Sequence, residues 1–371
     1  MNFDFSDDLK ELREQARRFL REKSPPATVR RILEGPEPYD KALWKEIAAM
    51  GWTAAAIPEE HGGAGLGHLG LCVLAEELGA SLAPLPFSSS VYLATEAIIA
   101  GGSEVQKKMW LPKLASGEAI GTLALAEGPG RADIRKLRTT FRGGALNGEK
   151  LPVPDGDVAD FAVVVAQGDR GLALALVDLK APDVTREPVE TIDPSRSHAR
   201  VSFANTPAEA LGAPGGGEAL LKRVQDRAAV LFAFEQVGGA QRCLESARDY
   251  ALERYAFGRP IGSFQAIKHK LADVYVATEL ARSNAYYGAW ALERDAPELP
   301  VAAASARICA GDAFFLAAKE NIQVHGGMGF TWEFDCHLYY RRAKLLSLTL
   351  GSTRHWKDRL ITQLETANAP L

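Results

Sequence analysis

The sequence has little of what marks secreted, membrane-spanning or nucleic-acid-binding proteins. A net charge of -4 offers no basic surface for nucleic acid or an anionic membrane. The longest apolar stretch, 301–319, is interrupted by Arg307 and Asp312, which argues against a membrane span. Cysteine is scarce and lacks the paired spacing of disulfide frameworks or cysteine-ligated metal sites. The four cysteines are Cys72, Cys243, Cys309 and Cys336.

What is present is the composition of an ordinary globular protein. Of the 371 residues, 47% are hydrophobic and 24% are charged. This length allows two or three domains with a large core. The N-terminal stretch carries acidic residues and lacks the apolar core of a signal peptide. We therefore expect a cytoplasmic protein with reduced thiols that acts on small molecules or binds other proteins.

The apolar pattern divides the chain into three segments and predicts an α+β fold. Residues 1–117 read as an all-α domain in which Ser6 is the expected N-cap of the first helix. Residues 118–213 contain short runs rich in Val, Leu, Thr and Phe, which predict an antiparallel β-barrel or sandwich. Residues 214–371 return to long helical patterns and predict a four-helix bundle. Residues 210–221 are rich in glycine and predict a linker.

One motif, QVHGGMGFTWE, places Gly326, Gly327 and Gly329 after a helical stretch. Each glycine inside a helix costs about 1 kcal/mol of stability relative to alanine, so the presence of three glycines here needs an explanation. They let a backbone approach a ligand that Gln323 could also reach, or they form a turn between helices. No strand precedes them, so the motif is not a dinucleotide-binding glycine fingerprint.

A second motif, ERYAFGRPIGSFQAIKHKLAD, lies at a junction between two predicted helices. Arg254 and Phe257 end the first helix, and Gln265 begins the second. An arginine, an aromatic face and an amide gathered there could hold a phosphate and a stacked ring. A helix C-terminus with its usual cation and glycine has the same pattern.

Other common catalytic signatures are missing. His325, Cys336 and His337 lie near the glycines, but their spacing fits no zinc site, so we expect structural or surface histidines. Neither the G-x-S-x-G elbow of hydrolases nor a phosphate-binding P-loop occurs.

The two motifs together, in this order, resemble the acyl-CoA dehydrogenase family. The resemblance runs nearly end to end, through IPEEHGGAG, LAEELG, GSEVQKKMWLPKLASGE, ALAE and LNGEK. It implies an FAD-dependent flavoprotein that oxidises an acyl-CoA thioester to the 2-enoyl form and passes electrons to an electron-transfer flavoprotein. It also implies N-terminal helices, a middle β domain and a C-terminal bundle, assembled as a dimer or tetramer.

The resemblance further implies roles for both motifs. In the family, the ADP end of the flavin crosses to a neighbouring subunit, which supplies R-x-x-F-G, a later glutamine and Q-x-x-G-G. All of these groups are retained here, and they are Arg254, Phe257, Gln265, Gln323, Gly326 and Gly327.

The catalytic base of the family is missing. It is usually a glutamate directly before a Gly-Thr or Gly-Ser pair, and here Leu350 precedes Gly351 and Ser352. In some members the base lies on the first long bundle helix, at a position that corresponds to Ala228. Neither side chain can accept a proton.

The flavin-ring side of the β domain departs from the family as well. Where the family tends to read T-E-P-x-x-G-S-D, this chain has AEGPGRAD, with Ala126, Arg131 and Ala132 at three of the usual positions. Pro152 and Pro154 stand where a tryptophan and a hydroxyl residue are expected. Groups that would tune the chain's own flavin are therefore lost.

The losses fall on groups that serve the chain's own flavin, whereas the retained groups serve a neighbour's. We infer a subunit of a heteromeric acyl-CoA dehydrogenase, such as a heterotetramer, that lends its adenosine-binding half to a catalytic paralogue. Paired subunits of this kind occur among bacterial enzymes for bulky acyl-CoA thioesters such as steroid side chains.

Two alternatives stay open. A self-sufficient enzyme could use a relocated base, either Glu235 or, less favourably, Asp226. Glu235 lies seven residues after Ala228 on the same helical face, but two turns are about 10 Å of rise, so the substrate would need a different pose. A salt-bridged structural role for Glu235 is the simpler interpretation. The other alternative is a scaffold that binds no flavin, which retention of the two motifs disfavours.

Overall fold

The computed structural model describes residues 5–130 and 132–367, which form two compact units. Among these residues, the first unit comprises 5–29, Cys72–Ala83 and 229–367, and the second comprises Arg30–Leu71, 84–130 and 132–228. Three of the described helices contribute residues to both units, namely α2 (Pro26–Glu34), α4 (Gly67–Ala80) and α7 (Gly217–Glu253).

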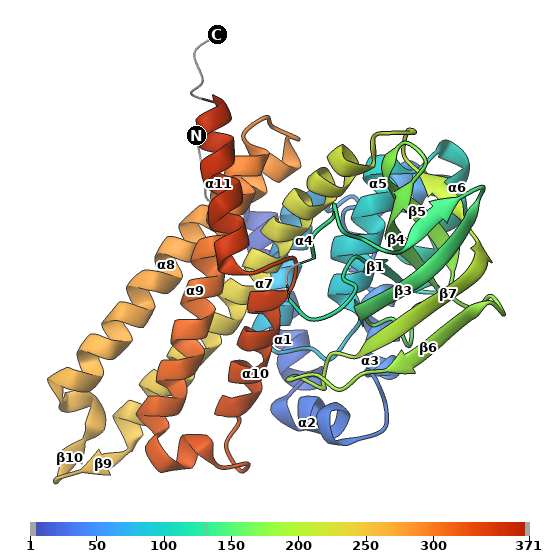
Figure 1. Cartoon of the computed structure of the whole chain (residues 1–371). Helices are drawn as coiled ribbons and strands as arrows, with labels where there is room; N and C mark the ends of the chain where they lie inside the picture. The colour runs from blue at the N-terminus through green and yellow to red at the C-terminus, as the bar shows by residue number, and fades with distance from the viewer. Residues whose placement is uncertain (1–4, 131, 368–371) are drawn as a thin grey trace. The chain divides into compact units, whose positions relative to one another are not determined.

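The first unit is helical. Its other helices are α1 (Asp7–Lys23), α8 (Gln265–Glu293), α9 (Leu299–His325), α10 (Cys336–Leu348) and α11 (Thr353–Ala367), with 3₁₀ turns η3 (Ile261–Ser263) and η4 (Gly326–Phe330). Helices α8 and α9 run side by side (Figure 1). Much of the buried surface of α9 is alanine, which lets neighbouring helices approach closely. Ser6 accepts a hydrogen bond from the Leu9 N–H at 3.4 Å, so its prediction as an N-cap is confirmed.

Helix α9 passes a simple test for membrane-spanning helices. The segment Leu299–Phe330 is long and apolar enough to cross a membrane by length and composition. Most of its apolar window is buried inside the protein, and the core helix of a soluble protein passes the same test. Arg307 within it is also buried and hydrogen-bonded to other parts of the chain.

The second unit combines short helices with a sheet. Its helices are α2 (Pro26–Glu34), whose first turn belongs to the other unit, α3 (Lys41–Ala49), η1 (Glu59–His61), the π-helix η2 (Ser88–Thr95), α5 (Glu96–Gly101) and α6 (Glu104–Ala115). Its strands are β1 (Gly121–Ala124), β2 (Thr140–Arg142), β3 (Ala145–Pro154), β4 (Phe161–Gly168), β5 (Gly171–Asp178), β6 (Val184–Pro188), β7 (His198–Pro207) and β8 (Glu209–Leu211).

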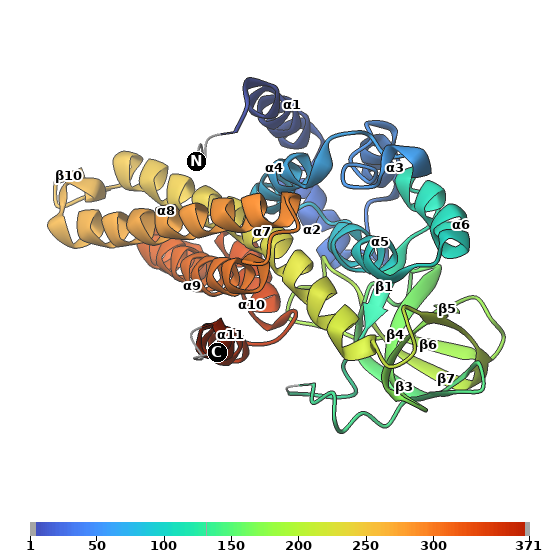
Figure 2. The ribbon, with the colours of Figure 1, turned by 90° about the horizontal axis from the view of Figure 1, so that it is seen from above.

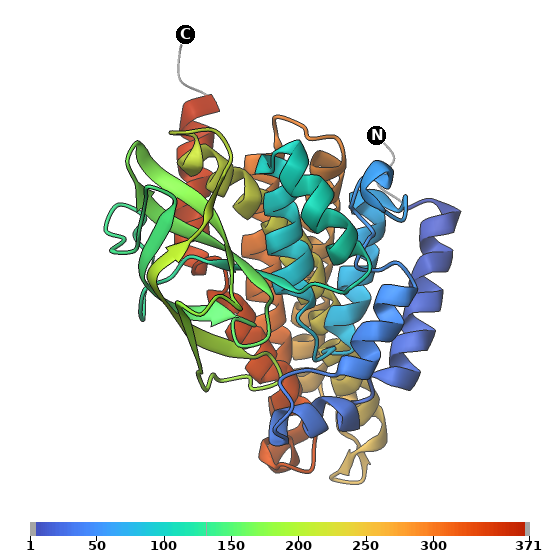
Figure 3. The ribbon, with the colours of Figure 1, turned by 90° about the vertical axis from the view of Figure 1, so that its right-hand side faces the viewer.

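The sheet is mixed, with strand order β6-β7-β3-β2-β4-β5-β8 and β1 paired with β4 (Figures 2 and 3). The predicted arrangement of helices, β domain and helices is confirmed. The middle segment was predicted as an antiparallel barrel or sandwich, and most of the described strand pairs are antiparallel, but β1 and β2 both pair with β4 in parallel. Each reaches β4 through a connection longer than a hairpin turn, which permits parallel pairing. The described strands do not close into a barrel.

The predicted linker at 210–221 is shorter than expected. Its first residues belong to β8, and α7 already begins at Gly217, which leaves 212–216 between them. A Cβ on Gly217 would lie 2.2 Å from the Leu172 carbonyl oxygen, so glycine allows the start of α7 to pack on β5. The bounds of the three domains remain predictions.

Candidate functional site

A small hydrophobic cluster joins the two sequence motifs within the first unit. Its members come from the end of α7, η3, the start of α8 and the end of α9, and they are Ala247, Tyr250, Ala251, Ile261, Ile267, Leu271 and Val324. The ring of Tyr250 also stacks on His325 at 4.1 Å between centroids. Residues 254–265 and 323–327 consequently lie at one end of the unit, which we call the hairpin end (Figures 1 and 3).

Phe257 occupies a turn that disfavours it. Strands β9 (Tyr255–Ala256) and β10 (Arg259–Pro260) are antiparallel and joined by Phe257 and Gly258, with φ of 53° and 77°. Two positive φ values define a type I′ turn, for which Asn-Gly is the preferred pair. The Phe257 side chain is nevertheless 95% exposed. Within this chain the ring has an edge contact with Phe264, at 6.2 Å between centroids, but the phenylalanine gains little burial from folding.

The start of α8 suits an anionic group. Gln265 is the first residue of α8 and is exposed, and no side chain caps this N-terminus. The exposed Arg254 is joined to the same segment, because its carbonyl accepts the Ile261 N–H at 2.7 Å. An uncapped helix N-terminus with a nearby guanidinium is a favourable environment for a phosphate.

The structure explains the glycines at positions 326 and 329 in different ways and leaves the one at 327 without a packing role. Gly326 ends α9 with φ of 60° and ψ of -139°, a conformation that favours glycine. Gly329 is buried, and a Cβ there would lie 2.5 Å from the Ile322 carbonyl oxygen. Gly327 has neither a positive φ nor any heavy atom within 4 Å of an added Cβ among the described residues. Gly327, like the exposed Gln323 before it, is thus not explained by packing within this chain.

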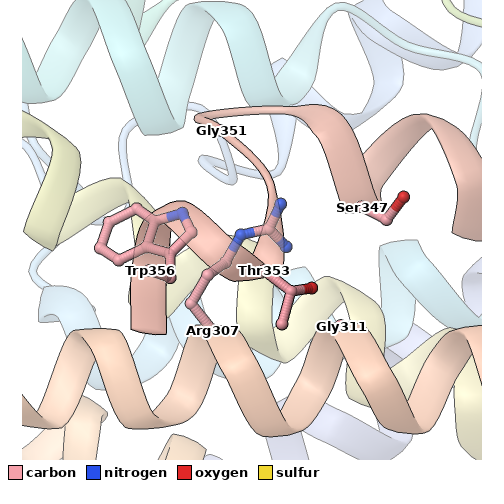
Figure 4. Close-up of a pocket in the computed structure, with 6 residues that line it drawn as sticks. All are labelled: Arg307, Gly311, Ser347, Gly351, Thr353 and Trp356. Atoms are coloured by element: carbon pink, nitrogen blue, oxygen red, sulfur yellow. The ribbon is translucent and has the colours of Figure 1, made fainter. Parts of the chain in front are cut away.

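The expected position of the base lies in a turn between α10 and α11, residues 348–352, which we call the Leu350 turn. Leu350 and Gly351 have φ of 61° and 100°. Arg307 donates hydrogen bonds to the carbonyl oxygens of Leu346 and, at 2.7 Å, Thr349, and so holds the end of α10. Figure 4 shows the guanidinium of Arg307 extending toward the turn that contains Gly351. The turn is therefore well supported, although the Leu350 side chain has no ionisable group.

Glu235 forms a buried ion pair. Its Oε1 lies 3.6 Å from Nη1 of Arg342, and both side chains are 1% exposed. A salt-bridged structural role was one of the interpretations of Glu235 that the sequence left open. The ion pair favours a fixed carboxylate over a general base. Ala228 is fully buried and Asp226 is buried, both in the second unit.

The segment that would face a flavin ring is held by a buried lysine that the sequence interpretation missed. Lys150 of LNGEK is fully buried and donates to Glu127 Oε1 at 2.8 Å and to the Leu125 carbonyl at 3.1 Å. Burial lowers the pKa of Lys150 to about 8, although Glu127 opposes this shift. The carboxylate of Glu127 also accepts the backbone N–H groups of Arg138 and Thr139. A lysine directly before the apolar end of the strand, LPVP, was the available signal.

The positions of this segment that differ from the family pattern carry no hydroxyl side chain. Ala126 and Ala132 are half-buried, and the Ala126 carbonyl accepts the Leu151 N–H at 2.8 Å. Pro152 and Pro154 lie in β3. Arg131 lies outside the described residues.

The histidines near the glycines have structural contacts. His325 is buried with Nδ1 2.8 Å from the Asn321 carbonyl oxygen, and His337 stacks on Trp332 at 4.3 Å. Across residues 5–130 and 132–367, no group of three or more His, Cys, Asp or Glu side chains is placed to hold a metal ion. All four cysteines are free.

Comparison with known proteins identifies the family. Residues 6–118 match the acyl-CoA dehydrogenase N-terminal domain, and residues 215–361 match the C-terminal domain. The chain is 35% identical over 356 residues to acyl-CoA dehydrogenase IpdE2 of Mycobacterium tuberculosis, covering 95% of this chain and 96% of that protein.

Two solved structures are also similar. The Tcur3481-Tcur3483 steroid ACAD matches with a TM-score of 0.90 and 32% identity, over 98% of this chain and 99% of that chain. The ChsE4-ChsE5 complex of Mycobacterium tuberculosis matches with a TM-score of 0.89 and 28% identity, over the whole of both chains. The chain therefore belongs to the acyl-CoA dehydrogenase family of FAD-dependent oxidoreductases that act on acyl-CoA.

Proposed function

We propose that this chain is one subunit of a heteromeric acyl-CoA dehydrogenase and binds the ADP half of the FAD held by a catalytic partner subunit. The residues that would do so form the hairpin end, and they are Arg254, Phe257, Gln265, Gln323, Gly326 and Gly327. The observation that carries the proposal is that Arg254, Phe257, Gln265 and Gln323 are exposed at one end of the unit, while both usual positions of the base lack a carboxylate.

Phe257 is the strongest support. A non-glycine residue in the left-handed conformation costs about 1–2 kcal/mol, and an exposed phenylalanine gains no burial in return. An adenine or another flat ring that stacks on Phe257 would bury the side chain and offset the cost of the backbone conformation. Gly327 supports the same interpretation, because its missing side chain leaves space for a ligand and not for another part of the chain.

Charge at the hairpin end fits a diphosphate. Arg254 offers a guanidinium that can hold phosphate oxygens with two hydrogen bonds, and the uncapped N-terminus of α8 offers backbone N–H groups and the positive end of the helix dipole. Gln265 and Gln323 add amides that can bind a ribose or base.

The residues on the flavin-ring side fit an isoalloxazine poorly. Ala126 and Ala132 have no hydroxyl to donate to the ring, and Pro152 and Pro154 have neither an indole nor a hydroxyl. Oxidation of an acyl-CoA requires a base for the α proton, while bound FAD accepts the β hydrogen as hydride. Leu350 and Ala228 cannot take that proton, so the partner subunit would supply both the base and the ring site.

The similar proteins suggest the kind of partner and substrate. Two of the similar structures carry names with two components, Tcur3481-Tcur3483 and ChsE4-ChsE5, and the first is a steroid ACAD. A paralogous acyl-CoA dehydrogenase is accordingly the proposed partner, with a bulky acyl-CoA thioester such as a steroid side chain as substrate. An electron-transfer flavoprotein would reoxidise the enzyme.

The test is to purify the chain alone and co-expressed with candidate paralogues, and to measure flavin absorbance per chain and its bleaching by acyl-CoA. We expect a colourless, inactive chain alone and about one flavin per two chains in the active mixed complex. A fully loaded chain that turns over alone would contradict the proposal and favour Glu235 as a relocated base. A chain that remains colourless with every paralogue would favour the scaffold.

A further inference from the structure

The end of α9 is built around one buried side chain, His325. Its imidazole is 7% exposed, and the residue directly precedes the pair Gly326 and Gly327. The ring of Tyr250, near the end of α7, stacks on it at 4.1 Å between centroids and 25° between planes. Phe334, which follows η4, meets the same imidazole in a T-shaped arrangement at 5.6 Å. His325 therefore joins the ends of α7 and α9, which reach the same end of the unit (Figure 1).

The glycine turn folds back onto the same histidine. A Cβ added to Gly329 of η4 would lie 3.0 Å from the Cβ of His325, so the turn packs closely against this residue. Gly326 begins the turn, and its N–H donates to the Gln323 carbonyl. Residues from α7, from η4 and from the segment before α10 thus converge on His325. A shift of the imidazole would move residues 323–327 relative to α7.

Tyr250 links this stack to Arg254. The Tyr250 carbonyl oxygen accepts the Arg254 N–H at 2.8 Å, and the Arg254 carbonyl in turn accepts the Ile261 N–H at 2.7 Å. The tyrosine ring also packs on the hydrophobic cluster that joins the two sequence motifs. Tyr250 consequently has its backbone bonded to the 254–265 segment and its ring against the residue that leads into the glycines.

A hydrogen bond fixes the plane of the imidazole. Nδ1 of His325 lies 2.8 Å from the carbonyl oxygen of Asn321, one turn earlier in α9. Because a carbonyl oxygen can only accept, Nδ1 carries the proton. Burial lowers the pKa of His325, although this hydrogen bond opposes the shift, so the ring is neutral near pH 7. Histidine thus combines a flat ring that stacks with a donor that fastens the ring to its own helix.

We propose that His325 is a positioning residue for the adenosine-binding site at the hairpin end. Through its stack on Tyr250 it sets the distance between the 254–265 segment and residues 323–327, so that both contact one ADP group. This inference rests on the proposed function. A diphosphate and a ribose joined in one ligand must meet both segments at once, so loss of the fixed spacing weakens binding although no contacting side chain is removed.

The test is the affinity for FAD of the mixed complex, measured by titrating its flavin-free form with FAD. His325→Leu fills the space but cannot stack, and it should weaken binding about 2- to 10-fold. In the same background, the factor lost through Arg254→Gln should become at least about threefold smaller, since coupled residues are not additive. His325→Phe keeps a stacking ring and should recover most of the affinity. Parent affinity in His325→Leu, or effects of the two substitutions that are additive, would overturn the proposal.

Two further variants separate positioning from general packing. Tyr250→Leu removes the same stack from the other helix and should reproduce the coupling with Arg254. Phe315 is the matched control, because it lies about three turns earlier in α9 and its ring packs against Tyr340 at 5.5 Å. Phe315→Leu should lower thermal stability and leave both the FAD affinity and the Arg254→Gln factor unchanged. The same coupling in Phe315→Leu would overturn the proposal, because any loosening of the bundle would then have this effect.

Failure of this inference differs from failure of the proposed function. If Arg254→Gln weakens FAD binding but no coupling to His325 appears, the proposed function stands and the positioning role is refuted. If Arg254→Gln leaves the FAD affinity of the mixed complex unchanged, both are refuted.

Discussion

The hairpin end and the Leu350 turn both place a large apolar residue at positive φ, and they differ in what holds that residue. Phe257 has φ of 53° and is 95% exposed, whereas Leu350 has φ of 61° and follows a helix end that Arg307 fixes from within the core. The Phe257 turn is unfavourable for the isolated chain, whereas contacts within the chain support the Leu350 turn. Strain without internal support therefore indicates a ligand or partner, and supported strain indicates a role in packing.

The largest expected effect is on stability, and it comes from removing a buried charge near the Leu350 turn. Glu235→Gln removes the carboxylate that pairs with Arg342 and attracts Arg307, and should lower the free energy of unfolding by about 3–5 kcal/mol. Urea denaturation measures this change, and Glu14→Gln is the exposed control, expected within about 0.5 kcal/mol of the parent. A stable Glu235→Gln protein that loses only turnover would instead support a catalytic Glu235.

The second-largest expected effect concerns a buried cluster of charged side chains in the other compact unit and its contribution to stability. Glu96 is fully buried beside His68, at 2.8 Å, and Arg227, at 2.5 Å. Burial opposes its ionisation, but His68 and Arg227 outweigh burial and lower the pKa of Glu96 to about 2. A lowered folded-state pKa contributes stability above the unfolded pKa, which is lost as the pH falls toward the folded value.

Glu96 should therefore contribute about 3 kcal/mol that disappears between about pH 4.5 and pH 2. Unfolding measured across this range should fall steeply for the parent and less steeply for Glu96→Gln. Parallel pH profiles for the two proteins would contradict this assignment.

The third effect returns to the hairpin end. Arg254→Gln should weaken flavin binding by the mixed complex about 10- to 100-fold, since a hydrogen bond to a charged phosphate contributes about 1.5–3 kcal/mol. Flavin retention during dilution measures it. Arg248→Gln is the matched control on the same helix, because Arg248 is exposed and forms an ion pair with its neighbour Asp249. Equal flavin retention in both variants would separate Arg254 from the cofactor.

The smallest effect compares the two turns directly. Phe257→Asn creates the Asn-Gly pair that a type I′ turn prefers and should stabilise the chain by about 1 kcal/mol. The same change should reduce flavin retention in the mixed complex, because a stacking ring is lost. Leu350→Asn also suits a positive φ but should leave flavin retention unchanged. Loss of retention in both variants would remove the distinction between the turns.

Local patterns were sufficient for most of the elements. Ser6 was identified as an N-cap from its position before an amphipathic helix, and β4 and β5 from runs of β-branched and apolar residues. Strands β6 and β8 were not predicted, because β6 is mostly polar and β8 has three residues within a glycine-rich stretch. Their strand conformation depends on pairing with β7 and β5.

The sequence by itself determined the order of helices, β segment and helices, the family and the absence of a carboxylate at positions 350 and 228, since these depend on residue identity and short spacing. Only the tertiary structure decided that Glu235 faces Arg342, that β1 and β2 are parallel to β4, and that Gly329 is needed for packing whereas Gly327 is not. These features arise between residues that are distant in the chain or from exact backbone geometry. Local propensity has no information about either, because burial and pairing depend on the completed fold.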